Sequence, residues 1–327
     1  MIQHSNPSPY AKLPDIILLF SQMLTTGVYS SFFLTTYLTF EDSIFQKRLN
    51  FYYHSLVYIF LIGFIVSALA LFFQYYNSRK ANDDTGEEQS KWFNSSRLYL
   101  YFLSGLLLQI ILYLFINGFE LLNFLIFLLA VSSILGIARA FSLKTKFDSW
   151  NHPTTAGGII EGSISLGAIA GLWAFATTDL SPVFAWIILI TLVFEILTLW
   201  ARFRYLSRWS YPTQESLKMM LGSHIALFAV RFIFGLVMPM VYLIWVLFIS
   251  NLSLLPIILM IFVGELSERI LFFITTAEQS DLKPQNGENL PDNNYRSTKI
   301  MIAKEADKVI RQFLKNIRIY WQVVFLV

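Results

Sequence analysis

The chain has 327 residues, of which 56% are hydrophobic, 17% aromatic and only 14% charged, and its formal net charge is +3. This composition is far from that of a soluble domain, so we interpret the sequence as an integral membrane protein. It contains no cysteine, which excludes Cys-ligated iron–sulfur clusters, Cys-ligated zinc and disulfides within the chain.

Apolar runs of about 20 residues, the length that crosses a bilayer as a helix, recur along the chain. Long Leu, Ile and Phe runs satisfy their backbone groups in lipid only as helices, and the period-2 alternation of a membrane barrel is missing. We therefore predict an all-α, polytopic bundle of eight transmembrane helices within residues 1–276. The spans are expected at 14–38, 51–76, 97–116, 119–142, 155–178, 181–203, 222–248 and 252–276.

Basic residues are distributed unevenly between the two ends of these spans. With eight spans, the N-terminus, the loops 77–96, 143–154 and 204–221 and the C-terminal tail share one end, which we call side A. Side A and its margin carry most of the Lys and Arg residues, whereas the opposite end has only Lys47 and Arg48. The positive-inside rule therefore predicts that side A is cytoplasmic in a multi-pass protein of the cell inner (plasma) membrane. The same asymmetry also fits a docking surface for an acidic partner.

The chain after the last span is polar. Residues 277–298 contain Pro, Asn and Gly and are predicted to form an irregular linker. Residues 299–327 place apolar and basic side chains on opposite faces at helical spacing, with Trp321 near the end. Such a basic amphipathic helix lies on an anionic membrane surface or against a partner, and we favour membrane lipid.

Charged residues fall within the predicted spans, where formal charge is expensive, and we consider six of them as candidates for one site. At a rise of about 1.5 Å per residue, all six lie in the half of the membrane next to side A and can share one polar pocket. An intramembrane ionisable group is a functional-site hypothesis by default. The structural alternative is that these charges neutralise one another in pairs and fix the packing of the helices. The six residues are Arg139, Glu161, Glu195, Arg231, Glu265 and Arg269.

In the structural alternative, specific ion pairs are expected. Glu265 and Arg269 are one helical turn apart and can pair along one face of a helix. Arg231 would pair with Glu161 or Glu195.

Histidines and short motifs argue against several other chemistries. His54 and His224 open their helices from opposite faces, nearly a membrane thickness apart, and His152 and His224 are expected in solvated or capping roles. We therefore predict no haem, no metal ligands and no catalytic residues in this chain. H-E-x-x-H and G-x-S-x-G are missing, and Gly157-Gly158 is interpreted as close helix packing by small residues. The basic residues border a membrane, so no nucleic-acid binding is expected.

Five segments carry a resemblance to a known family. In order they are "LPDIILLFSQMLTTGVYSSF", "IGFIVSALALF", "KWFNSSR", "ARAFSLKTKFDSWNHPTTAGGII" and "VGELSERILFF". Their order and spacing over 13–276 resemble the DmsC-type membrane anchor subunit of dimethyl sulfoxide reductases. The most specific pieces are Arg139 followed by Trp150, Asn151, Pro153 and Thr154, and Gly264-Glu265 with Arg269 and Phe272-Phe273.

The resemblance implies a function in anaerobic electron transport. Members of this family are eight-helix anchors without haem. The resemblance implies that this chain, which holds no iron–sulfur cluster, binds an iron–sulfur electron-transfer subunit and a molybdopterin catalytic subunit, and that it oxidises menaquinol near the docking face. Candidates for the polar part of the quinol pocket are Arg139, Trp150, Glu161, Glu265 and Arg269.

Two positions depart from the family. Members typically carry a histidine at the end of the second helix and a glutamate at the start of the third, where this chain has Ala70 and Ser96. Either Glu161, Glu265 or His152 handles the protons instead, or the chain is a purely structural anchor that has lost quinol oxidation. A proton-coupled membrane transporter, with the intramembrane charges as a relay, is a further interpretation, although no inverted repeat is visible.

Overall fold

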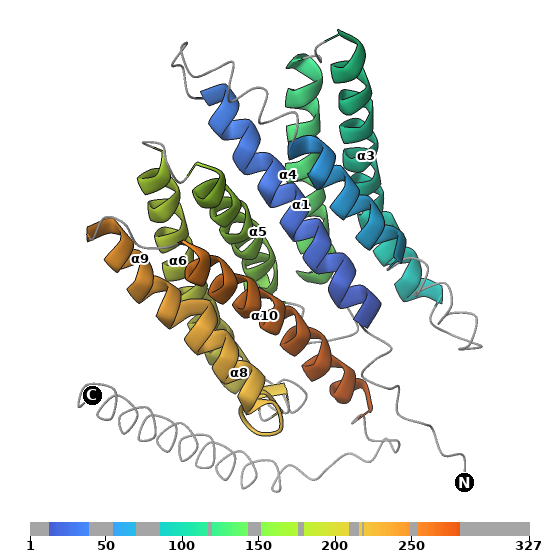
Figure 1. Cartoon of the computed structure of the whole chain (residues 1–327). Helices are drawn as coiled ribbons and strands as arrows, with labels where there is room; N and C mark the ends of the chain where they lie inside the picture. Colours follow the sequence, from blue (N-terminus) through green and yellow to red (C-terminus); the bar gives the residue numbers. More distant parts are fainter. Residues whose placement is uncertain are drawn as a thin grey trace, which may run out of the picture.

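The described part of the chain is almost entirely helical, and its helices run side by side in one bundle (Figure 1). The computed structural model describes residues 13–38, 55–69, 86–116, 120–142, 152–175, 180–208, 216–217, 219–248 and 254–281. In chain order the elements are α1 (Leu13–Leu38), a helix over Ser55–Leu69, α3 (Gly86–Ile116), α4 (Glu120–Ser142), α5 (Pro153–Ala174), α6 (Ser181–Arg208), α8 (Ile225–Phe232), the π-helix η2 (Ile233–Val237), α9 (Met238–Phe248) and α10 (Leu255–Asp281).

Six helical segments among the described residues are long and apolar enough to cross a membrane, and each coincides with a predicted span. They are Ile16–Thr36, Arg97–Phe115, Leu121–Ser142, Pro153–Ala174, Ser181–Ser207 and Ile225–Phe248. The helical class is thereby confirmed for the described residues, and the six segments indicate a multi-pass membrane protein. Of the two other predicted spans, one is described only as the shorter apolar helix Ser55–Leu69, and the other is α10, whose apolar stretch contains three charges. Eight spans remains a prediction.

Several sequence-based predictions lie outside the described residues. The tail 299–327 is not described, nor are Trp150 and Ala70. Helix α10 continues to Asp281, so its last turn covers the first residues of the segment expected as a linker. The remainder of that linker lies beyond the described part of the chain.

Helix α5 lies between α1 and α6 because its surface is lined with small residues (Figure 1). A Cβ atom on Gly27 of α1 would overlap the carbonyl oxygen of Ser163, and one on Gly167 would overlap the backbone of Gly27. Small residues spaced four apart allow such close backbone approach where lipid supplies no hydrophobic driving force. At the other end of α5, a Cβ on Gly158 would lie 3.2 Å from Glu268 Oε1, whereas at Gly157 the nearest atom is 3.6 Å away. The close packing expected for this pair is thus found at Gly158.

Helices α1, α3, α4 and the Ser55–Leu69 helix make up what we call the neutral half of the bundle. Aromatic rings pack between them, and the Tyr29 hydroxyl donates a hydrogen bond of 2.8 Å to the Asn123 carbonyl. The hydroxyls of Thr25 and Tyr99 are 2.9 Å apart, also fully buried. These two contacts between helices are hydrogen bonds between neutral groups.

Helices α5, α6, α8 and α10 form the charged half, and a π-helical turn shapes it. Pro239 has no N–H, so the carbonyl four residues earlier, that of Gly235, loses its normal helical partner. In the preceding turn, the Met238 N–H donates a hydrogen bond to the carbonyl of Ile233, five residues earlier. This spacing makes η2 a π-helix. Gly235 packs directly on Gly264, since a Cβ on Gly235 would lie 2.9 Å from the Gly264 Cα atom. This crossing brings the segment that carries Arg231 against α10.

Candidate functional site

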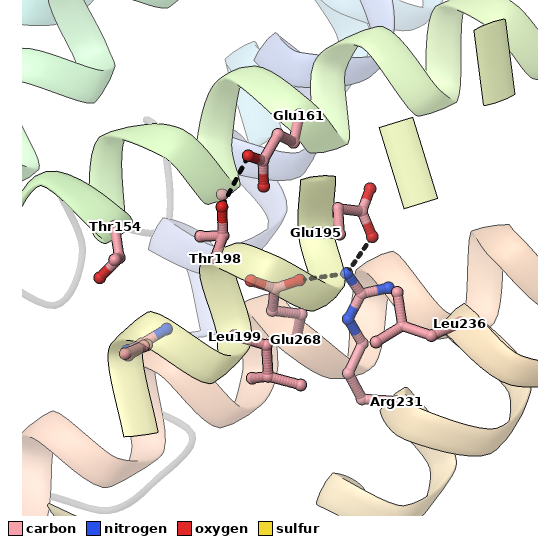
Figure 2. Close-up of a pocket in the computed structure, with 10 residues that line it drawn as sticks. Thr154, Glu161, Glu195, Thr198, Leu199, Arg231, Leu236 and Glu268 are labelled. Atoms are coloured by element: carbon pink, nitrogen blue, oxygen red, sulfur yellow. Dashed lines mark hydrogen bonds and ion pairs between the residues drawn. The ribbon is translucent and has the colours of Figure 1, made fainter. Parts of the chain in front are cut away.

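Seven charged side chains meet between the helices of the charged half, and we call them the charge cluster. Figure 2 labels Glu161, Glu195, Arg231 and Glu268. The carboxyls of Glu195 and Glu268 point toward Arg231, whereas Glu161 lies beside Thr198. The cluster consists of Glu161 from α5, Glu195 and Arg202 from α6, Arg231 from α8, and Glu265, Glu268 and Arg269 from α10.

Arg231 is the centre of the cluster. Its Nη2 atom lies 2.5 Å from Glu195 Oε2 and 2.6 Å from Glu268 Oε2, and its Nη1 atom is 3.3 Å from Glu265 Oε1. The Arg231 and Glu195 side chains are both buried. One guanidinium therefore joins three carboxylates on two other helices, α6 and α10, away from water.

Arg269 joins α10 to α5. Its Nη2 atom donates a hydrogen bond of 2.8 Å to the Gly158 carbonyl and lies 3.3 Å from Glu265 Oε2 and 3.8 Å from Glu268 Oε1. The one-turn pairing of Glu265 with Arg269 that the sequence predicts is thus present. Both side chains are almost fully buried, so the pair fixes how α10 sits on α5.

Glu161 differs from the other acids of the cluster. The Thr198 hydroxyl donates a 2.7 Å hydrogen bond to its Oε1 atom, and within the described residues Glu161 makes no ion pair. Its Oε2 atom is buried and has no hydrogen-bond partner. The pairing of Arg231 with Glu195 is therefore the one formed, and Glu161 remains without a guanidinium contact.

A cavity of about 20 Å³ lies next to these residues. A water molecule needs a cavity of roughly 10–15 Å³, so this cavity has room for about one water. Sites for organic ligands are commonly of about 300–1,000 Å³. The lining residues are Thr154, Gly158, Glu161, Glu195, Thr198, Leu199, Arg202, Arg231, Leu236 and Glu268.

The charges of the cluster do not balance. Four carboxyl groups and three guanidinium groups make up the cluster, so full ionisation would leave one surplus negative charge between the helices. An unbalanced charge away from water costs several kcal/mol, about the size of a protein's whole stability margin. A bound proton or a small cation would remove this cost. Among the described residues, no group of three or more His, Cys, Asp or Glu side chains is arranged to hold a metal ion.

His152 lies at the side A end of α5, outside the predicted span, and caps the helix. Its Nδ1 atom accepts a 3.2 Å hydrogen bond from the Thr154 N–H and lies 2.7 Å from the Thr154 hydroxyl. Burial, and secondly the positive charge of Arg202, lower the pKa of His152. The capping role expected from the sequence is present, with a neutral imidazole favoured.

The five candidates for a quinol pocket divide into three groups. Glu161, Glu265 and Arg269 are together in the charge cluster. Arg139 is an exposed residue near the end of α4 and is not among those that line the cavity. Trp150 lies outside the described residues.

The six charges considered as candidates from the sequence leave out two members of the cluster. Glu268 contacts both Arg231 and Arg269, and the signal for it was its spacing, three residues after Glu265 on the same helix face. Arg202 lies near the side A end of the predicted span 181–203. It lines the cavity, and its guanidinium lies 5.5 Å from the centre of the Phe272 ring. The long aliphatic part of an Arg side chain can extend several ångströms from its Cα atom. Its position in the sequence therefore does not show where its charged group lies.

Comparison with protein-family models, curated proteins and solved structures finds no match to this chain. The function must therefore be argued from the motifs and from the geometry of the bundle.

Proposed function

We propose that this chain is the membrane anchor subunit of a molybdoenzyme-type oxidoreductase complex in the cell inner membrane, with eight spans and menaquinol as the electron source. One observation carries the proposal. Segments that resemble the DmsC type, and that are far apart in the sequence, meet in space. The Phe141 ring centre lies 5.6 Å from that of Phe272 and 6.0 Å from that of Phe273, and Arg269 binds the Gly158 carbonyl.

This convergence lies where α4 ends and α5 begins, at the end of the spans assigned to side A. In the proposal, side A is the docking face for the iron–sulfur subunit, which in turn holds the molybdopterin subunit. Basic residues concentrate at this end, and they would complement an acidic partner surface and steer its association. Metal redox chemistry belongs to the partners in this proposal, since the chain contains no cysteine to ligate a cluster.

The charge cluster does not fit a quinol ring. Its cavity of about 20 Å³ is close to the volume of one water, and its guanidinium groups are engaged with carboxylates. A quinol ring would therefore bind outside the cluster. Within the proposed anchor, the cluster residues brace α5, α6, α8 and α10 against one another.

Affinity purification in mild detergent tests the proposal. The tagged full-length chain is isolated, its bound proteins are identified, and iron and molybdenum are quantified against an unrelated tagged multi-pass protein prepared in parallel. We expect an iron–sulfur subunit and a molybdenum subunit in stoichiometric amounts. A single chain without either metal, from membranes in which other complexes stay intact, would contradict the anchor function.

Quinol titration then separates a redox anchor from a structural one. In the purified complex, added menaquinol analogue is expected to reduce the iron–sulfur clusters. The same titration with Glu265→Gln asks whether the charge cluster takes part. Clusters that stay oxidised in the wild-type complex would assign the chain a purely structural anchoring role.

A second function, proton-coupled transport, is favoured by a different observation, the surplus carboxyl of the cluster. Intramembrane carboxyl groups that alternate between protonated and ionised forms are the common element of proton relays. In proteoliposomes that contain the chain alone, this function predicts proton flux that Glu161→Gln abolishes. Flux equal to that of empty liposomes would remove this candidate.

A further inference from the structure

Three of the four acids in the charge cluster form ion pairs with guanidinium groups, and among them Glu265 Oε1 is paired by charge without a hydrogen bond. Glu195 accepts from the Ser165 hydroxyl at 2.8 Å and from Arg231 at 2.5 Å. Glu265 lies 3.3 Å from Arg231 through one oxygen and 3.3 Å from Arg269 through the other. Glu268 contacts the same two guanidinium groups at 2.6 and 3.8 Å. All three acids therefore have a guanidinium group as a counter-charge.

Glu161 is arranged differently. One of its oxygens accepts from Thr198, while the other is buried, has no partner and belongs to a side chain that lines the cavity. An ionised carboxylate with a buried, unsatisfied oxygen is strongly disfavoured. A protonated carboxyl in the same place carries an O–H group, and the cavity has room for about one water to accept its hydrogen bond.

The charge count agrees with this geometry. If Glu161 is neutral, three carboxylates remain beside three guanidinium groups, and the cluster carries no net charge. We propose that Glu161 is a proton-binding site that holds one proton at neutral pH and exchanges it with side A through the cavity, Thr154 and His152.

The exchange route follows the first two turns of α5. Thr154 lines the same cavity as Glu161, and its hydroxyl lies 2.7 Å from Nδ1 of His152, the residue that precedes the helix. His152 is partly exposed. The cavity that Glu161 borders is therefore also lined by Thr154, whose hydroxyl contacts the residue that precedes the helix.

The groups that face Glu161 come from every helix packed around it. Helix α6 contributes Thr198 beside it and Glu195 and Arg202 beyond, α8 contributes Arg231, and α10 contributes Glu265, Glu268 and Arg269. Helix α4 carries Arg139, which is exposed, and the side of α1 opposite Gly162 presents Met23. Apart from Glu161, the cluster holds three carboxyl groups and three guanidinium groups, so their formal charges sum to zero when all are ionised.

This proposal goes beyond the anchor function and does not depend on it. A chain that fails to retain metal-containing partners can still hold the proton, and an anchor that retains them can lack it. The two experiments therefore fail separately.

Infrared difference spectroscopy of the full-length chain in lipid nanodiscs tests the proposal. The wild-type protein is expected to show the carbonyl stretch of a protonated carboxyl at neutral pH, which shifts in D2O and disappears when the pH is raised. Glu161→Gln is expected to fold with unchanged thermal stability and to lack this band, because its amide is neutral and of similar shape. Thr198→Val is expected to keep the band and move it to higher frequency, because it loses the donated hydrogen bond.

Two results would overturn the proposal. One is a protonated-carboxyl band that persists unchanged in Glu161→Gln, which would place the proton on another acid. The other is the absence of the band in wild type at neutral pH. If stability then depends on Na⁺, the surplus charge is balanced by a cation. If Glu161→Gln does not fold, the frequency shift in Thr198→Val decides the assignment.

Discussion

The neutral and charged halves of the bundle solve the same problem by different chemistry. Both bury polar groups between helices in a lipid-like interior. In the neutral half, hydroxyls and a backbone carbonyl form hydrogen bonds of 2.8–2.9 Å between helices. In the charged half, guanidinium and carboxylate groups are joined at 2.5–3.8 Å.

This difference separates packing from function. Neutral hydrogen bonds in membrane bundles contribute modestly, on the order of 1 kcal/mol each, and a helix pair can hold together with few of them. A buried ion pair gains little over an apolar replacement, yet removal of one partner is severely destabilising. A bundle that needed only to pack would not require seven charges, so the charged half is where an activity is to be sought.

Arg231→Met is expected to have the largest effect. It leaves Glu195, Glu265 and Glu268 without their shared partner, and loss of one member of a buried pair costs about 3–5 kcal/mol. Thermal or denaturant unfolding in detergent measures it. Arg139→Met, on the exposed face of α4, is the matched control and should change stability by less than about 0.5 kcal/mol. Equal stabilities of the two variants would break the distinction between the halves.

Gly264→Ala addresses the crossing that delivers Arg231 to α10. The added methyl group would overlap the Gly235 backbone, and overpacking of this kind costs about 1–3 kcal/mol. Gly157→Ala is its control, because the nearest atom to a Cβ there is at an ordinary 3.6 Å. Unfolding midpoints of the two variants in the same detergent are compared. A Gly264→Ala protein as stable as Gly157→Ala would show that the crossing relaxes freely.

Tyr99→Phe measures the neutral half. Removal of the hydroxyl that faces Thr25 at 2.9 Å is expected to cost about 0.5–1.5 kcal/mol, with the same loss at low and high salt because no charge is involved. The unfolding free energy is measured at two ionic strengths. A loss as large as that of Arg231→Met, or one that depends on salt, would show that the two halves do not differ as described.

His152→Ala is expected to have the smallest effect, about 0.5–1 kcal/mol, from loss of the α5 cap. The pKa of His152 is lower in the folded chain than in the unfolded chain. As the pH falls, His152 is therefore protonated more readily in the unfolded chain. Wild-type stability should therefore decline as the pH drops below the ordinary histidine value of 6.5. The variant should lack this contribution, as unfolding curves at several pH values will show. An identical pH dependence in both proteins would contradict the assignment.

The helices themselves were predictable because their cause is local. Apolar runs of membrane-spanning length appear directly in the sequence, and six of them coincide with long apolar helices. The pairing of Glu265 with Arg269 followed from one-turn spacing on a single helix. The π-helical turn was also encoded locally by Pro239, although sequence reasoning did not use it.

The composition of the cluster was only partly predictable. Position along each span placed Glu161, Glu195, Arg231, Glu265 and Arg269 at similar depth, and the structure brings these five together. Depth gives no rotation about the helix axis, so Arg139 at a comparable depth is exposed on α4.

The sequence by itself determined a helical membrane protein with intramembrane charges concentrated toward one end, because hydropathy and helical rise depend only on residue order. Tertiary structure alone decided which acid lacks a counter-charge. Glu161 and Glu195 are equivalent in the sequence as buried carboxyls, yet Arg231 reaches Glu195 and not Glu161. That choice depends on the Gly235–Gly264 crossing and on the rotation of α5, which arise from contacts between helices and are not encoded within any one of them.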